Sequence, residues 1–289
     1  MVLGVPSFIM ENHSFKAKDH LVSGAEFDIV WNENKKCFQT LPVPEDMELY
    51  YDSPDYISHS DGETTLMDKI YQRAKKANLA KKFRLVERCN RGKGVLMDVG
   101  AGTGQFVRYA QERDWEAYGV EPNDQARELA HQKGVSVYKS LSVQKAPVYD
   151  VVTLWHVLEH MADLDKNIRE IYSVLKPGGW LILALPNYRS LDAKHYKSHW
   201  AAYDVPRHLW HFSKESVEQL FSDAGFELKS VKPLWLDAFY ISWLSETYKQ
   251  NKFAPLYGFA LGLASNIAGI FTREYSSHVY ILQKAGEPV

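Results

Sequence analysis

The chain has 289 residues, of which 45% are apolar and 24% are charged, and its formal net charge at pH 7 is −2. This composition is typical of a globular protein, argues against extensive disorder and shows no sign of the basic surplus that nucleic-acid binding requires. Only Cys37 and Cys89 are present, which excludes a disulfide framework and a four-cysteine zinc site and predicts a reduced, cytoplasmic protein. The length fits one α/β enzyme domain with an N-terminal extension and an insertion.

Residues 1–60 are expected to form the N-terminal extension. Two stretches rich in β-formers, 27–31 and 36–40, flank the turn-forming residues 32–34 and predict a β-hairpin. Residues 1–10 lack the basic start of a signal peptide, so we expect this end to be unprocessed and poorly ordered. A tyrosine-rich loop with Tyr50, Tyr51 and Tyr56 follows, and a linking helix is expected within residues 61–89.

Residues 90–289 are expected to form the main domain. Short apolar runs at 95–97, 115–120, 135–138, 151–155 and 180–185 alternate with amphipathic segments at 104–114, 123–133 and 163–175. This alternation predicts a doubly wound, mostly parallel α/β sheet. Lys176-Pro177-Gly178-Gly179 is expected to close the third helix with a left-handed glycine cap. A further helix at 213–224 and strands at 226–231 and 278–282 bring the sheet to seven strands.

The turn after the first strand of the main domain carries three glycines. Asp98 ends the strand, and Gly100, Gly102 and Gly104 follow at alternate positions before a helix. Glycine lets the backbone approach a ligand closely because no Cβ intervenes. A dinucleotide fingerprint would require glycine at position 105, which is glutamine here, so a pyrophosphate cradle is disfavoured. A purely structural tight turn stays open as the alternative.

A second acid follows the next strand. Glu121 lies 21 residues after Gly100, at the distance where a neighbouring parallel strand returns to the same edge. Its carboxylate could accept both hydroxyls of a ribose. The alternative is an exposed acid that favours the N-terminus of the following helix.

These motifs resemble the class I S-adenosylmethionine-dependent methyltransferases. The resemblance covers residues 90–186 and rests on Asp98 to Gly104, Glu121, Tyr149 to His160 and the turn at Lys176 to Gly179. The Leu158-Glu159-His160 ending is most similar to the subgroup of ubiquinone- and menaquinone-type methyltransferases and uncharacterised bacterial relatives. The resemblance implies a Rossmann-like fold and S-adenosylmethionine as the cofactor. The residues expected to bind it are Asp98, Gly100, Ala101, Gly102, Gly104, Phe106, Glu121, Pro122, Trp155 and His156.

Relatives in this subgroup often begin with a cysteine-paired, zinc-ribbon-like module. This chain keeps a hairpin pattern there but only Cys37, so a structural hairpin without zinc is expected.

The segment after the fourth strand of the main domain carries candidate catalytic histidines. His156, Glu159 and His160 lie at i, i+3 and i+4 and would share one face of a helical turn. His156 or His160 could then take the acceptor proton, or the three could bind a divalent cation. Capping and orienting the loop is the alternative role.

The segment 195–212 holds four of the 11 histidines together with several aromatic rings. We predict that it forms a lid over a flat or anionic substrate, with Arg207 and His211 as its catalytic residues. The alternative is a loop packed by its own rings. His195 with His199, or His208 with His211, have a spacing compatible with a metal site, which stays a further alternative for this segment. No metal is expected, because cysteine ligands are missing here and a third and fourth ligand are not identifiable beside His156 and His160.

The insertion at 236–272 is predicted to be helical and is rich in large apolar residues. They could line the pocket, form a dimer contact or lie on a membrane surface. Residues 254–272 contain proline, glycines and polar side chains, so no transmembrane segment is predicted.

The favoured function is methyl transfer to an oxygen, nitrogen or carbon atom of a small-molecule acceptor, which is aromatic, anionic or lipid-like. A noncatalytic S-adenosylmethionine-binding module and, less favoured, a nicotinamide-dependent oxidoreductase are the alternatives. Nucleic acid and an integral membrane position are not expected, and a homodimer stays open.

Overall fold

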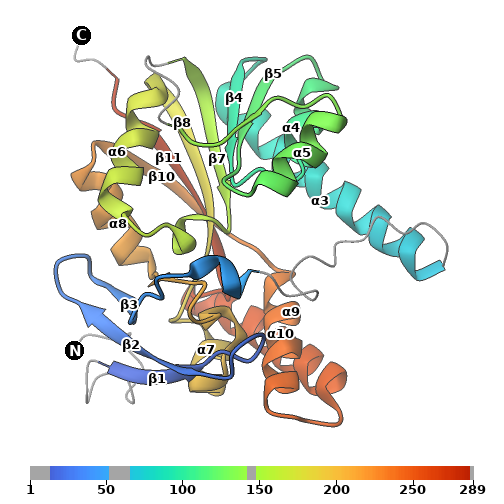
Figure 1. Cartoon of the computed structure of the whole chain (residues 1–289), viewed down its shortest axis with the longest axis vertical. Helices are drawn as coiled ribbons and strands as arrows, with labels where there is room; N and C mark the ends of the chain where they lie inside the picture. The colour runs from blue at the N-terminus through green and yellow to red at the C-terminus, as the bar shows by residue number, and fades with distance from the viewer. Residues whose placement is uncertain (1–13, 52–65, 142–147, 287–289) are drawn as a thin grey trace.

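A computed structural model describes residues 14–51, 66–141 and 148–286. In the linking helix, which begins at residue 66, it describes side chains from residue 76 onward. Its centre is a seven-stranded sheet with the order β10-β11-β8-β7-β4-β5-β6 (Figure 1). The strands are β4 (Val95–Val99), β5 (Glu116–Val120), β6 (Val137–Tyr138), β7 (Tyr149–Trp155), β8 (Leu175–Pro186), β10 (Phe226–Pro233) and β11 (Ser277–Lys284). Strands β4 to β8 pair in parallel, whereas β11 is antiparallel to both of its neighbours.

Helices cover both faces of this sheet. The helices are α3 (Leu66–Asn90), α4 (Gln105–Gln111), α5 (Asp124–Gln132), α6 (Leu164–Val174) and α8 (Lys214–Asp223). Strand β8 shows why two layers form, because Leu181 and Leu183 pack with α6 and α8, whereas Ile182 between them packs with α3 and α4. Alternate side chains of a strand point to opposite faces, so a continuous apolar run needs a cover on each side. The predicted doubly wound fold is confirmed.

One local prediction at strand β8 was wrong. Helix α6 ends at Val174, and its C-cap is Leu175 in an extended conformation instead of a left-handed glycine. Leu175 is fully buried and already pairs with Tyr149 of β7, so the chain enters the sheet before the glycines are reached. Gly178 does have a positive φ of 74°, but it lies within β8.

A second, antiparallel sheet has the order β1-β2-β3-β9. The predicted hairpin is confirmed as β2 (Glu26–Asn32) and β3 (Cys37–Leu41), which pair in register from Asp28↔Leu41 to Asn32↔Cys37. Sequence reasoning missed β1 (Ser14–Lys18) on one edge and β9 (Trp210–His211) on the other. The hairpin therefore packs directly against the histidine-rich segment. Residues 1–10, which we predicted to be poorly ordered, and Tyr56 lie outside the described ranges.

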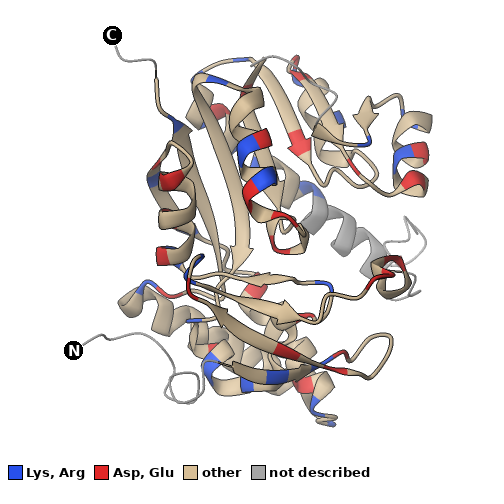
Figure 2. Ribbon diagram, turned by 60° about the vertical axis from the view of Figure 1, so that its left-hand side comes forward, with Lys and Arg blue, Asp and Glu red and all other residues tan. Residues whose placement is uncertain are grey.

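The remaining elements join the two sheets. They are η1 (Met47–Tyr50), η3 (Leu158–His160), α7 (Leu191–Tyr196), η4 (Lys197–His199), η5 (Ala201–Tyr203), α9 (Asp237–Tyr248) and α10 (Ala254–Thr272). The insertion is helical as predicted, and its two helices pack as a hairpin beside α7 at the end of the molecule away from α6 (Figure 1). Figure 2 shows acidic and basic residues interspersed over the described part of the chain.

Candidate active site

The glycine turn between β4 and α4 has the backbone that the sequence predicted. Gly100, Gly102 and Gly104 have φ values of +73°, +52° and +73°, which L side chains rarely adopt. Their surroundings differ. A Cβ on Gly100 would lie 2.3 Å from a methyl of Val157, whereas a Cβ on Gly102 would meet nothing within 4 Å. The protein therefore packs against Gly100 and leaves open space at Gly102.

The acids that follow the first two strands of the main domain lie on either side of this turn. Glu121 accepts hydrogen bonds from the backbone N–H groups of Gly102, at 2.9 Å, and Asn123, at 3.0 Å. Asp98 is buried and accepts a 2.6 Å hydrogen bond from the hydroxyl of Thr153. Burial raises the pKa of Asp98 to about 6 despite that hydrogen bond. Glu121 is therefore already oriented by the turn that it was predicted to serve.

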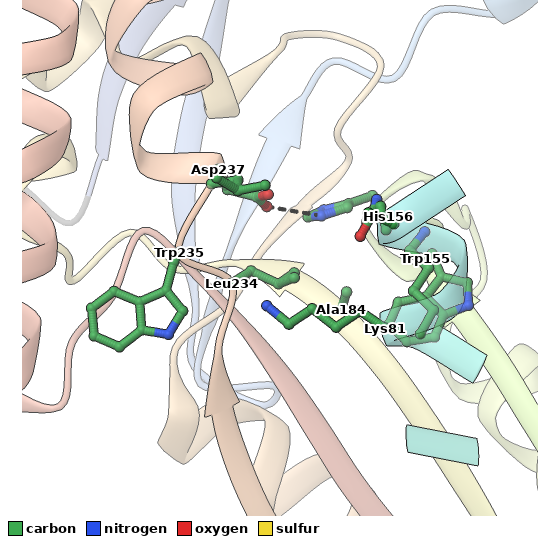
Figure 3. A pocket seen from close by; sticks show the side chains of 11 residues that line it. Lys81, Trp155, His156, Ala184, Leu234, Trp235 and Asp237 are labelled. Atoms are coloured by element: carbon green, nitrogen blue, oxygen red, sulfur yellow. Dashed lines mark ion pairs between the residues drawn. The ribbon is translucent and has the colours of Figure 1, made fainter. Parts of the chain in front are cut away.

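A cavity of about 280 Å³ opens beside the turn, at the carboxyl ends of β7 and β8 (Figure 3). Its walls come from three parts of the chain: the end of β7 with Ala184 of β8, the junction of β10 and α9, and α3. The lining residues are Ala77, Asn78, Lys81, Lys82, Trp155, His156, Ala184, Leu234, Trp235, Leu236 and Asp237. Trp155 also packs edge-on against Phe106 of α4, at 5.9 Å between ring centroids, so the cavity adjoins the predicted cofactor turn.

His156 lies between two carboxylates at this cavity. Its Nε2 is 3.1 Å from Oδ2 of Asp237, and its Nδ1 is 3.3 Å from Oε1 of Glu159 (Figure 3). Although burial alone would lower its pKa, the two carboxylates raise the pKa of His156 to about 10. Its φ of +59° is in the left-handed region, which costs energy for a non-glycine residue and often marks a functional position. The ring is therefore held as an imidazolium facing the cavity.

Sequence reasoning missed Lys82 and Asp237. The ammonium of Lys82, on α3, lies 4.5 Å from the centre of the Trp155 ring, and burial lowers its pKa. Asp98 and Asp237 oppose that shift. Asp237 begins α9, inside a stretch that the sequence analysis treated only as apolar. Asp237 could have been noticed as an acid at the start of an apolar stretch. Nothing in the sequence distinguishes Lys82 from its lysine neighbours.

His160 does not line the cavity. Its Nδ1 lies 3.1 Å from the hydroxyl of Tyr51 and 3.0 Å from the carbonyl oxygen of Arg207. Burial, with His208 close by, lowers the pKa of His160 to about 4. Glu159, His160 and His208 place one potential ligand atom each within 4.8 Å of one another. Among the described residues, this group adds His208 of the histidine-rich segment to Glu159 and His160, which the sequence had placed together with His156.

Arg207 and His211, the predicted lid residues, are not among the residues that line the cavity. The Arg207 side chain is 1% exposed and forms ion pairs with Asp19, at 3.0 Å, and Asp204, at 2.7 Å. His211 lies on β9, where its Nε2 is 2.9 Å from the hydroxyl of Thr40. Burial lowers the pKa of His211 well below its usual value. The structure thus ties both residues to the antiparallel sheet, through Asp19 after β1 and Thr40 of β3, instead of placing them on a lid.

Comparison with known proteins decides the family. A family model described as a methyltransferase domain matches residues 67–231, more than half of the chain. The chain belongs to this methyltransferase family. The predicted resemblance to class I S-adenosylmethionine-dependent methyltransferases is therefore confirmed, and the matched region includes every residue that was expected to bind the cofactor.

Curated relatives match this methyltransferase over part of their length. The ubiquinone biosynthesis O-methyltransferase of Nitrosospira multiformis is 33% identical over 106 residues, which cover 33% of this chain and 44% of that protein. The corresponding enzyme of Bordetella avium is 28% identical over 102 residues, which cover 32% of this chain and 42% of that protein. An uncharacterized methyltransferase of Geobacillus kaustophilus is 25% identical over 173 residues, which cover 54% of this chain and 78% of that protein. The chain thus spans less than half the length of the two ubiquinone enzymes.

Solved structures support the fold of the methyltransferase. A putative sarcosine dimethylglycine methyltransferase from Galdieria sulphuraria superposes with a TM-score of 0.51 at 15% identity, covering 75% of this chain and 88% of that chain. A SAM-dependent methyltransferase from Archaeoglobus fulgidus gives a TM-score of 0.50 at 19% identity, covering 72% of this chain and 94% of that chain. At these identities the likeness shows the fold alone.

The residues present fit S-adenosylmethionine. Open space at Gly102 leaves room for a ligand against the backbone, and Glu121 is held beside it. The indole Nε1 of Trp155 is buried and has no hydrogen-bond partner within the described part of the chain. A buried donor without a partner costs free energy, which a bound ligand can recover.

Proposed function

We propose that this protein transfers a methyl group from S-adenosylmethionine to a small-molecule acceptor bound in the cavity at the ends of β7 and β8. The observation that carries the proposal is the junction of the two half-sites: Trp155 packs on the helix that follows the glycine turn and also lines the cavity. Reactants in doubly wound sheets meet beyond the carboxyl ends of the strands, which is where both half-sites lie.

The cofactor half-site consists of the glycine turn and Glu121. When bound, S-adenosylmethionine supplies a methyl group already activated on a sulfonium, so the protein needs no nucleophile of its own. The backbone at Gly102 would lie against the cofactor, and the Glu121 carboxylate would accept its ribose hydroxyls. Asp98 stays buried in β4, where it accepts the hydrogen bond of Thr153 from neighbouring β7.

The acceptor half-site favours an oxygen nucleophile that carries negative charge. Lys81, Lys82 and His156 bring three cationic groups to the cavity, and Asp237 and Glu159 balance two of them. A cation close to the acceptor oxygen stabilises its ionised form, which attacks a sulfonium methyl group more readily than a neutral hydroxyl does. A pKa of about 10 means that His156 is protonated near pH 7. This argues against the predicted role of a histidine base. Because both ring nitrogens face carboxylates, His156 would act on the acceptor through its positive charge and by holding Asp237 in place at the cavity.

The cavity walls also orient the acceptor. Trp155 and Trp235 provide aromatic surfaces, while Ala184 and Leu234 keep the floor apolar. Such walls exclude water and suit a flat or partly apolar molecule. The ubiquinone enzymes named above are O-methyltransferases by name, in keeping with an oxygen acceptor here. A cytoplasmic location and a homodimer stay predictions.

A screen of phenols and carboxylic acids with methyl-labelled S-adenosylmethionine tests the proposal. We expect label transfer to at least one acceptor class, and about a 100-fold lower rate for His156→Gln with unchanged cofactor affinity. His195→Gln is the control, because His195 is exposed and does not line the cavity. Cofactor binding without turnover on any acceptor would favour the noncatalytic binding module. Wild-type turnover in His156→Gln would remove its assigned role.

A further inference from the structure

Helices α9 and α10 expose an unusual amount of apolar surface. Of the nineteen large apolar side chains that are exposed among the described residues, twelve lie between 235 and 271. Phe271 is 82% exposed, Leu236 is 70% exposed and Leu256 is 67% exposed. Exposed apolar side chains concentrated in one part of a folded protein point to an interaction site.

Helix α10 is oriented with its small residues inward and its large apolar residues outward. The residues that face the body include Gly258, Gly262 and Ser265, whereas Phe259 and Leu263 beside them are exposed. A Cβ on Gly258 would lie 2.4 Å from the Cα of Trp243, so the backbones of α9 and α10 touch. A helix that served only its own core would bury its large side chains, and this one buries its smallest.

Polar contacts fix this orientation. Ser265 donates a 2.6 Å hydrogen bond to buried Asp192 of α7, and the side-chain amide of Asn266 donates a 2.8 Å hydrogen bond to the carbonyl oxygen of Trp235. Strand β11 of the central sheet begins only five residues after α10 ends. Although α10 is long and apolar enough to span a membrane by length and composition, these contacts hold it against the body along its length.

The exposed charges of this hairpin all have one sign. Asp237, the first residue of α9, is partly buried and paired with His156, and the charged residues from there to residue 273 are Glu246, Lys249, Lys252 and Arg273. Glu246 is buried, and the three cations are exposed at the two ends of α10. A two-fold contact between copies of this face would bring its cationic ends into the same interface, whereas an anionic lipid surface complements them. Apolar side chains with aromatic rings and a cationic fringe are typical of helices that lie in a membrane interface.

We propose that the exposed face of the α9–α10 hairpin docks on an anionic lipid bilayer, with α10 parallel to the surface over its length of about 28 Å. Trp235 and Leu236 belong both to this face and to the cavity lining, so the cavity opens toward the bilayer. An acceptor with an apolar tail would reach the cavity from the bilayer. That consequence rests on the proposed function, whereas the docking does not.

Vesicle flotation tests the docking. We expect the protein to float with vesicles that contain phosphatidylcholine and phosphatidylglycerol, and to bind phosphatidylcholine vesicles more weakly. The double variant Leu256→Gln/Phe271→Gln should partition at least tenfold less, since both side chains are exposed and their loss leaves the core intact. Leu129→Gln is the matched control, because Leu129 is an exposed leucine on α5. Calorimetric titration with S-adenosylmethionine should be the same for all three proteins, which separates docking from the proposed function.

Quenching of tryptophan fluorescence by brominated lipids tests which face docks. Trp235 and Trp243 are exposed on the proposed face, so quenching should be lost in Trp235→Phe/Trp243→Phe while flotation persists. Quenching that persists in this variant would place another face on the bilayer. A wild-type protein that does not float would overturn the proposal. If it also sediments as a dimer that Leu256→Gln/Phe271→Gln separates, a second copy covers the face instead.

Discussion

The sequence predicts candidate sites at two places, the turn at residues 98–104 and the segment at 195–212. The surroundings of these two places differ in the structure. The glycine turn lies at the open carboxyl edge of the sheet, with free space beside Gly102. The second segment packs against the antiparallel sheet and contributes β9 to it, and its Arg207 and His211 are almost completely buried. The glycine turn resembles a ligand site because of its backbone, whereas the other segment resembled one only because of its residue types.

The difference follows from how far away the partners lie in the sequence. The turn is formed by neighbouring residues, and Glu121 follows from the regular return of the next parallel strand. Arg207 pairs with nearby Asp204 but also with Asp19, which is 188 residues earlier, and His211 contacts Thr40, which is 171 residues earlier. A histidine or arginine pattern alone does not reveal such partners.

The largest effect that sharpens this comparison concerns Arg207. Arg207→Ala should lower the free energy of unfolding by about 3–5 kcal/mol, because it leaves buried Asp19 without its cation. Denaturant unfolding measures this loss. Arg108→Ala, which removes an exposed ion pair with Glu112, should cost less than about 0.5 kcal/mol. If Arg207→Ala has normal stability but selectively loses acceptor binding, the predicted lid role of Arg207 is supported instead.

A second variant tests the turn itself. Gly102→Val should abolish S-adenosylmethionine binding, because the side chain would occupy the open space at the turn. Gly134→Val is the control, since Gly134 also has a positive φ, at 75°, and open space but lies between α5 and β6. Both should lose about 1–2 kcal/mol of stability through backbone strain. Equal cofactor affinity in the two variants would reduce the turn to a structural element.

Most of the fold and the backbone of the glycine turn could be predicted from the sequence. Strand and helix positions follow from apolar periodicity, and the turn from its glycines. The acceptor half-site could not be predicted, because His156, Lys82 and Asp237 come from three separate elements. Taking the acceptor proton would require a neutral His156, whereas Asp237 and Glu159 raise its pKa to about 10.

The titration of His156 provides a smaller effect. Its pKa is raised from 6.5 to about 10 in the folded protein, so its contribution to stability is fully present below pH 6.5 and is lost as the pH rises toward 10. The wild-type unfolding free energy should therefore fall over this window. His156→Gln should show a flatter profile, measured by denaturant unfolding across the pH range. Parallel profiles for the two proteins would mean that His156 is not held as an imidazolium.

The smallest expected effect is that of metal removal. We predict that the purified protein holds no stoichiometric zinc and that a chelator leaves stability and cofactor affinity unchanged. The carboxylate of Glu159, within the group that also contains His160 and His208, is already paired with the His156 imidazolium. That positive charge would repel a zinc ion bound there. Elemental analysis after dialysis measures the content, and one equivalent of zinc would make this group a metal site.

Calorimetric titration of the wild-type protein with S-adenosylmethionine and with NAD tests the central claim most directly. The account predicts micromolar-scale binding of S-adenosylmethionine and none of NAD, because the turn lacks a pyrophosphate cradle. Glu121→Ala should weaken S-adenosylmethionine binding by about 2 kcal/mol, through loss of charge-assisted hydrogen bonds to the ribose. Binding of NAD in place of S-adenosylmethionine, or unchanged affinity in Glu121→Ala, would contradict the account.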